Sequence, residues 1–311
     1  MPDELIVPIP PIPKEILEAV NTNTLSVFVG AGVSRIMGCT GWGKLASNLV
    51  RRCKSITKPG DGSPLLTFRE TEILARYSDH KKTITICYDI LKDSGCEDSF
   101  FEELEQSFVP DEKQSQFHDI YQQLYGLRGL FITTNADKHF DLQFNKDRIV
   151  YENFKPEDID PTKLYHIHGS ILARESLIFK VQDYIRTYRD GKFQSFLRHI
   201  FSSRTVLFVG YGMSEFELLD FIITKADTGH EIELKHFILL SFYTGEEADL
   251  KFEQQYHNKM GVTVVPYQKD ENGYNQLYAV IKDWNTRINQ TSTFLYETYK
   301  EIEDIVDSYG R

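Results

Sequence analysis

The sequence of 311 residues lacks the features that mark several large classes of protein. No apolar run approaches the roughly 20 residues that a membrane-spanning helix requires, so we expect no membrane partner. The first residues, MPDELIVPIPPIPKE, carry acids and prolines where a signal peptide has a basic start and an apolar core. We therefore expect no export signal and a cytoplasmic location.

Cysteine is scarce, and its spacing excludes the common metal and redox motifs. The cysteines are Cys39, Cys53, Cys87 and Cys96, and no two of them have C-x-x-C spacing. A structural zinc site or a thioredoxin-like motif needs such a pair. We expect reduced thiols and no bound metal.

Clusters of basic residues are also missing, and the net charge is −11. A protein that binds nucleic acid directly needs a basic patch, and the pairs Arg51-Arg52 and Lys81-Lys82 are too small to form one. We expect no direct contact with nucleic acid. Apolar residues at 41% and charged residues at 26% are ordinary for a globular domain.

Short apolar runs predict the strands of a parallel sheet. The first run covers residues 25–30 and the next convincing one covers 130–134, and the segment between them has helical periodicity. The predicted fold is α/β, a Rossmann-like parallel sheet with a large helical insertion between the first two strands, at about residues 41–126. Later strands are predicted at residues 148–151, 164–168, 206–210, 237–240 and 262–266.

The chain is divided by these elements into three parts. Residues 1–24 are predicted to form a proline-rich arm and a helix, residues 25–290 the main domain, and residues 291–311 a C-terminal helix. That last helix has an apolar stripe at Leu295, Tyr299, Ile302 and Val306. The stripe either packs on the chain's own sheet or binds a partner.

Four motifs that could carry chemistry each follow a predicted strand. Gly30-Ala31-Gly32-Val33-Ser34 suits a phosphate cradle, or else is a tight turn that needs glycine for packing. Asn135 and Asp137 could bind a ribose, a water or an amide, or else cap a helix. Ligands of open α/β sheets bind at this carboxyl edge of the strands.

The other two motifs lie further along the chain. His168, followed by Gly169, suits a general base near neutral pH, or else is a buried histidine bonded to a carbonyl. His166 shares its strand face, but the strand end and the glycine favour His168. Gly210, Gly212 and Ser214 suit the adenosine side of a dinucleotide, or else form an ordinary loop with a helix cap.

The order GAG-x-S, T-x-N-x-D, HG and G-x-G-x-S resembles the sirtuin superfamily. It is most similar to the sirtuin-like NAD-hydrolysing domains of bacterial anti-phage defence systems, which carry a Trp-x-x-Leu segment like Trp42-x-x-Leu45 here. The sequence departs from the protein deacylases, because it has no Asp-Phe-Arg after the first glycine turn and no cysteine between His168 and Gly210.

The resemblance implies a set of roles and a reaction, the hydrolysis of NAD to nicotinamide and ADP-ribose without a metal. Catalytic roles fall to Asn135, which would hold the nicotinamide ribose and its attacking water, and to His168, which would be the base. The residues implied to line the phosphates are Gly30, Ala31, Gly32 and Ser34. Asp137 would contact the nicotinamide amide. The adenosine ribose would be contacted by Gly210, Gly212 and Ser214.

The resemblance also implies regulation, through a homo-oligomer and a protein partner such as an ATPase, an Argonaute-like subunit or a phage protein. Three alternatives stay open: a non-catalytic NAD or ADP-ribose sensor, a deacylase without zinc, and a Rossmann oxidoreductase. The last is disfavoured because Arg35 stands where the third glycine of G-x-G-x-x-G belongs, and no acidic residue lies near Val50.

Overall fold

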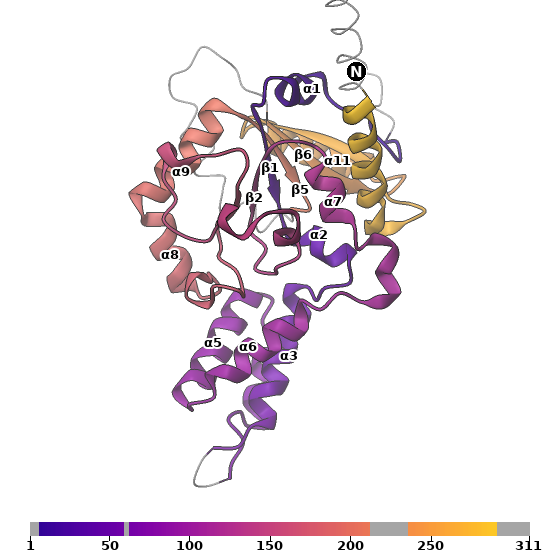
Figure 1. Cartoon of the computed structure of the whole chain (residues 1–311). Coiled ribbons are helices and arrows are strands. Elements are labelled where there is room, and N and C mark those ends of the chain that lie inside the picture. The colour runs from indigo at the N-terminus through magenta and orange to yellow at the C-terminus, as the bar shows by residue number, and fades with distance from the viewer. Residues whose placement is uncertain (1–5, 59–61, 212–235, 291–311) are drawn as a thin grey trace, which may run out of the picture.

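Seven parallel strands form one sheet in the computed structural model, which describes residues 6–58, 62–211 and 236–290 (Figure 1). The strand order is β3-β4-β2-β1-β5-β6-β7. The strands are β1 (Leu25–Val29), β2 (Leu130–Thr133), β3 (Ile149–Val150), β4 (Leu164–His166), β5 (Thr205–Val209), β6 (His236–Phe242) and β7 (Val262–Gln268). The predicted Rossmann-like parallel sheet is confirmed, and each predicted strand forms within two residues of its expected bounds.

The central strands β1 and β5 are apolar except for Ser26 and Thr205, because both faces of the sheet are covered. Every residue of β1 and of β5 is buried. Val27 of β1 lies in register with Phe131 of β2 on one side and with Leu207 of β5 on the other. Continuous apolar runs are typical of parallel strands that have helices on both faces.

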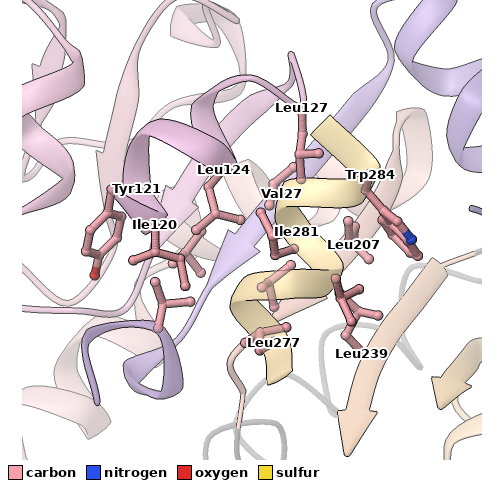
Figure 2. Close-up of a cluster of buried hydrophobic side chains, with 14 of the residues drawn as sticks. Val27, Ile120, Tyr121, Leu124, Leu127, Leu207, Leu239, Leu277, Ile281 and Trp284 are labelled. Atoms are coloured by element: carbon pink, nitrogen blue, oxygen red, sulfur yellow. The ribbon is translucent and has the colours of Figure 1, made fainter. Parts of the chain in front are cut away.

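Each face of the sheet packs against its own set of helices. The first face packs against α1 (Lys14–Asn21), α2 (Ala31–Ile36), α7 (Ile120–Tyr125) and a helix over residues 276–290 (Figure 2). The second face packs against α9 (Gly191–Ser203) and α11 (Glu247–Asn258). Val27 belongs to the first core and Phe28 to the second, because successive strand residues point to opposite faces.

The proline-rich arm is packed against the helix over residues 276–290. Gln276 Nε2 donates to the carbonyl of Pro8 at 2.8 Å, and Trp284 Nε1 donates to the carbonyl of Pro10 at 2.9 Å. Proline lacks the N–H that would extend a sheet, but its carbonyl still accepts these side-chain donors.

The long connection from β1 to β2 is helical, as predicted. After α2 it contains α3 (Trp42–Ser55), α4 (Phe68–Ala75), α5 (His80–Asp93), α6 (Glu97–Ser107), a 3-10 helix (Glu112–Phe117) and α7. Helices α3 to α6, which we call the helical module, share a core of their own that Ala136 and Phe179 join. Because Ala136 follows β2, the module adjoins the edge of the sheet where the strands end (Figure 1).

The chain reverses its direction across the sheet between β1 and β5. After β1 it continues towards β2 and β4, whereas after β5 it continues towards β6 and β7, although β1 and β5 are direct neighbours. Such a topological switch point opens a crevice at the carboxyl ends of the two strands. Gly30-Ala31-Gly32 follows β1 and Gly210-Tyr211 follows β5 at this point.

The predicted C-terminal helix over residues 291–311 lies outside the described residues, and the proposed domain bounds remain predictions. No helix in the described part of the chain is both long and apolar enough to cross a membrane.

Candidate functional site

The two glycine turns at the switch point touch each other. Gly32 N donates to the carbonyl of Gly210 at 2.8 Å, and Gly30 N donates to the carbonyl of Val209 at 2.9 Å. A Cβ on Gly32 would lie 2.6 Å from Gly210 O, and Gly210 itself has a φ of +68°. Both glycines are therefore required for the close approach of the two turns.

The loop after β2 carries Asn135 into the same crevice. Asn135 Nδ2 lies 3.1 Å from the carbonyl oxygen of Gly30, 3.0 Å from Ser34 Oγ and 3.0 Å from the Tyr121 hydroxyl. A carbonyl oxygen can only accept, so the group that faces Gly30 is the amide nitrogen. This contact fixes the orientation of the side-chain amide, and Asn135 Oδ1 points away from the Gly30 carbonyl.

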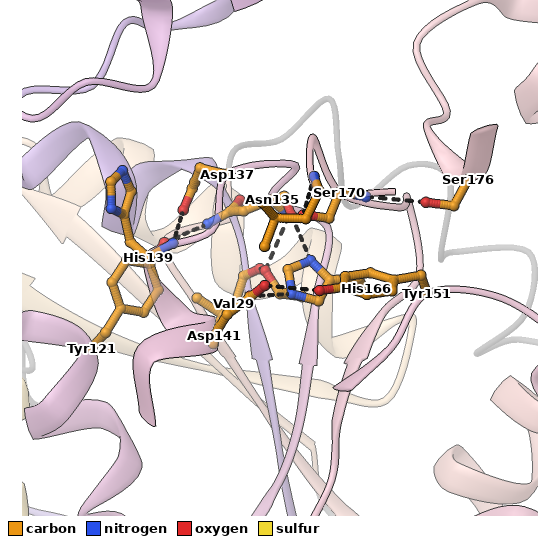
Figure 3. A network of polar contacts seen from close by, with 12 residues as sticks. Val29, Tyr121, Asn135, Asp137, His139, Asp141, Tyr151, His166, Ser170 and Ser176 are labelled. Carbon is orange, nitrogen blue, oxygen red and sulfur yellow. Dashed lines mark hydrogen bonds and ion pairs between the residues drawn. The ribbon is translucent and has the colours of Figure 1, made fainter. Parts of the chain in front are cut away.

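The side chains of Tyr121, Asn135 and Asp137 lie close together (Figure 3), and a chain of buried hydroxyl groups connects Asn135 to Asp137. Ser34 Oγ donates to Asp137 Oδ2 at 2.6 Å and lies 2.7 Å from the Tyr121 hydroxyl. Burial, together with the charge of Asp137, raises the pKa of Tyr121, which keeps its hydroxyl protonated. Because Ser34 gives its proton to Asp137, Tyr121 donates to Ser34 and accepts from Asn135.

Two buried oxygens at this loop have no hydrogen-bond partner among the described residues. They are Asn135 Oδ1 and Thr134 Oγ1, and both residues line the cavity described below. An unsatisfied buried acceptor costs about 1–3 kcal/mol, so such atoms mark the place where a ligand or a water hydrogen-bonds.

His168 lies just beyond the end of β4, in the turn that follows it. The side chain is 6% exposed, and Nε2 lies 2.8 Å from the Tyr188 hydroxyl. Burial, with a smaller contribution from the positive charge of Lys81, lowers the pKa of His168 to about 3. The imidazole is therefore neutral at physiological pH, which is the form that accepts a proton.

An open cavity joins these groups at the carboxyl edge of the sheet. Its floor contains Ala31, Ser34, Thr134, Asn135, Asp137 and His168. Its walls are mainly apolar. They come from the helical module and the residue that follows it, from the segment before α8 (Val181–Arg189) and from α8 itself, with Trp42, Leu45, Phe108, Ile178, Phe179 and Tyr184. Mostly apolar walls with a few convergent polar groups are typical of small-molecule sites.

Charge in the cavity is limited to two groups among the described residues, Asp137 and Lys81. Asp137 is 2% exposed and is occupied by Ser34 and by the amide of His139. Lys81 Nζ lies 4.8 Å from the ring centroid of Tyr184. The Cys39 thiol also lines the cavity, and burial raises its pKa to about 12, so it is no nucleophile.

The structure brings together most of the residues that the sequence indicated. Ala31, Ser34, Asn135, Asp137 and His168 line one cavity, and Gly30, Gly32 and Gly210 form the adjoining turns. Gly212 and Ser214 lie outside the described residues. The Ser34 hydroxyl and the amides of Gly32 and Val33 are already hydrogen-bonded within the protein, so their contact with phosphate remains a prediction.

Several residues of the site were missed from the sequence. Tyr121 reads as a core residue of an amphipathic helix, and Lys81 as one of a solvated pair. Tyr184 and Tyr188 are spaced by four residues, which places both on one face of a helix and is the signal that could have identified them.

The described residues contain no group of three or more His, Cys, Asp or Glu side chains that could hold a metal. The comparison with protein families gives one match: residues 129–265 match the SIR2-like domain. The match supports a place in the sirtuin-like superfamily. No curated protein matches the chain. The matched segment runs from the start of β2 to β7 and includes Asn135, His168 and Gly210, and SIR2-like domains use NAD as a substrate.

Proposed function

We propose that this sirtuin-like chain hydrolyses NAD at the bond between nicotinamide and ribose, releasing nicotinamide and ADP-ribose. The C–N glycosidic bond breaks, nicotinamide leaves as a neutral molecule with the bonding electrons, and water adds its oxygen to the ribose carbon and loses a proton. Such a reaction needs a bound dinucleotide, an oriented ribose and a placed water.

The observation that carries the proposal is the unsatisfied Asn135 Oδ1 in a cavity that also holds the neutral imidazole of His168. Asn135 Oδ1 accepts a hydrogen bond from a ribose hydroxyl or from the attacking water, and Thr134 Oγ1 offers a second contact. His168 accepts the proton that the water loses.

The proposal extends to the role of the reaction in the cell. Hydrolysis of a central cofactor drains the cell that contains the enzyme, which suits a response to phage infection in the cytoplasm. It also requires control, so we infer that a homo-oligomer and a regulatory partner (an ATPase, an Argonaute-like subunit or a phage protein) switch the activity on. Support for this part comes from the resemblance of the motifs and from the toxicity of the reaction.

One observation favours a second function, a sensor that binds NAD or ADP-ribose without cleaving it. The pKa of His168 is near 3 and its Nε2 is engaged by Tyr188, and such a histidine is a weak general base. A ligand that displaces the Tyr188 contact would free Nε2 to accept a proton, whereas a pure sensor has no need of a free Nε2.

The decisive experiment incubates the purified chain with NAD, alone and with candidate partners, and measures free nicotinamide and ADP-ribose. Equal amounts of the two products that grow with time support hydrolysis. Saturable binding of NAD by calorimetry, with no nicotinamide released under any of these conditions, would identify a sensor instead.

A further inference from the structure

A second buried polar cluster lies directly beneath the candidate site, outside the cavity lining. It consists of His166, Asp141 and Tyr151 (Figure 3). His166 is 0% exposed and Asp141 is 7% exposed. His166 Nε2 lies 2.7 Å from Asp141 Oδ1, and the Tyr151 hydroxyl donates to Asp141 Oδ2 at 3.0 Å.

The other ring nitrogen of His166 points at the site. Its Nδ1 lies 3.1 Å from the main-chain carbonyl oxygen of Asn135. The carbonyl only accepts, so Nδ1 carries a proton, and the shared edge with Asp141 holds a second one. Burial raises the pKa of Tyr151, so its hydroxyl stays protonated and donates to Asp141.

The loop that carries Asn135 is held at each of its turns. Thr134 N donates to the carbonyl of Val29, Asn135 N to Thr133 Oγ1 at 3.0 Å, and Ile171 N to the carbonyl of Ala136. The first and third of these contacts join main-chain groups, and the second is accepted by the Thr133 side chain at the end of β2. The contact from His166 to the Asn135 carbonyl comes from a different strand, β4, and is made by a side chain that Asp141 holds in place.

We propose that His166 and Asp141 are positioning residues that aim the Asn135 side chain into the cavity. The inference rests on the proposed function, because it assigns these residues to the same reaction. Rotation of the Asn135 peptide would move Oδ1 relative to the bound ribose, and a misplacement of about 1 Å costs on the order of 100-fold in rate. Neither residue touches the substrate.

Two substitutions of one residue separate positioning from mere packing. The amide of asparagine stands where Nδ1 of histidine does, so His166→Asn keeps a donor for the Asn135 carbonyl. The longer His166→Gln places its amide near Nε2 and contacts Asp141 instead. We expect His166→Gln to lower kcat roughly 10–100-fold with KM within about threefold of wild type, and His166→Asn to stay within about threefold in kcat.

A third variant removes the charge but keeps the hydrogen bonds. In Asp141→Asn the amide nitrogen donates to His166 Nε2 and the amide oxygen accepts from Tyr151, so Nδ1 keeps its proton towards Asn135. We expect kcat near that of wild type for Asp141→Asn and near that of His166→Gln for Asp141→Leu. Equal kcat for His166→Gln and His166→Asn, or wild-type kcat for Asp141→Leu, would overturn the positioning role.

The positioning role can also be tested by a measurement that does not depend on activity, so its outcome is separate from the test of the proposed function. In labelled protein, the Asn135 side-chain amide resonances, assigned with Asn135→Ala, should shift in His166→Gln and keep their wild-type position in His166→Asn. If the wild type releases no nicotinamide, the proposed function fails and these resonances alone decide the positioning role. Unchanged resonances in folded His166→Gln refute it.

Discussion

The amide nitrogen of Gly32 donates a 2.8 Å hydrogen bond to the carbonyl oxygen of Gly210. The two residues are far apart in the sequence and belong to the turns that follow β1 and β5, the neighbouring strands at which the chain reverses direction. Their contact closes the base of the crevice beside Asn135. Any side chain at Gly32 would have to displace main-chain atoms rather than a flexible side chain.

Gly32→Ala should therefore destabilise the fold. The new Cβ would lie 2.6 Å from Gly210 O, and overpacking of this kind costs about 1–3 kcal/mol in the free energy of unfolding. Gly191→Ala is the matched control, because a Cβ there meets nothing within 4 Å and alanine favours the start of α9. Urea denaturation measures both, and equal stability of the two variants would contradict the packing role of Gly32.

Asn135→Ala and His168→Ala should each abolish the release of nicotinamide while leaving the chain folded. Loss of a positioned general base lowers the rate by roughly two to four orders of magnitude. His199→Ala on the exposed face of α9 is the control and should keep wild-type turnover. A folded His168→Ala protein with wild-type turnover would eliminate His168 as the base.

The lowered pKa of His168 makes a prediction about stability and pH. The pKa falls from its ordinary value of 6.5 to about 3 on folding, so between these values the unfolded chain binds a proton that the folded chain does not. Stability is therefore lost as the pH falls below about 6.5, by up to about 1.4 kcal/mol per pH unit through this group. Comparing wild type with His168→Gln in urea at pH 7.5, 6 and 5 isolates this slope, and parallel curves would disprove it.

The same shift predicts the pH dependence of catalysis. Because His168 is neutral throughout, kcat/KM should show no acid limb from this residue between pH 5 and 8. A titration of the His168 imidazole near pH 6.5, measured by NMR, would show that burial and Lys81 do not lower the pKa of His168.

The chain should bind no stoichiometric zinc and should show little activity on acetyl-lysine peptides. The reason lies in the sequence, which has no cysteine between His168 and Gly210 and no Asp-Phe-Arg after the first glycine turn. Elemental analysis of the purified protein and a deacetylation assay with NAD check the two parts. Bound zinc at one equivalent, or rapid deacetylation, would contradict this prediction and indicate a protein deacylase.

The isolated chain should be oligomeric and weakly active, and a partner or a higher assembly should raise its turnover. Unregulated hydrolysis of NAD is toxic, which is the reason for this expectation. Mass in solution and NAD turnover are measured across a concentration series, with and without a candidate partner. A monomer with full turnover at every concentration and with every partner would remove the regulatory part of the proposal.

Much of the fold could be predicted from the sequence because local patterns specify it. Runs such as residues 25–29 and 205–209 are apolar except for Ser26 and Thr205, which is typical of parallel strands covered on both faces. Helix α1 also forms within the predicted N-terminal segment of residues 1–24, since its apolar positions recur with the helical period. The strand order could not be predicted, because no local pattern states which strand lies beside β1.

The residues of the site that follow strands directly could be predicted from local patterns, and those that come from packed helices could not. Asn135 and His168 follow strands directly, and the carboxyl ends of parallel strands share one edge, so their meeting in one cavity follows from the sheet. Tyr121 and Tyr188 come from helices whose burial looks like ordinary packing in the sequence. Their hydroxyl contacts with Asn135 and His168 depend on how those helices pack against the sheet.

The sequence by itself determined a parallel α/β sheet, a helical connection after β1 and polar loops at the strand ends, because periodicity and glycine act over a few residues. Only the tertiary structure decided that Gly32 meets Gly210, that Ser34 connects Tyr121 to Asp137, and that His166 rather than solvent holds the Asn135 carbonyl. These contacts join distant segments, and their partners are chosen by close packing in three dimensions, which no local pattern encodes.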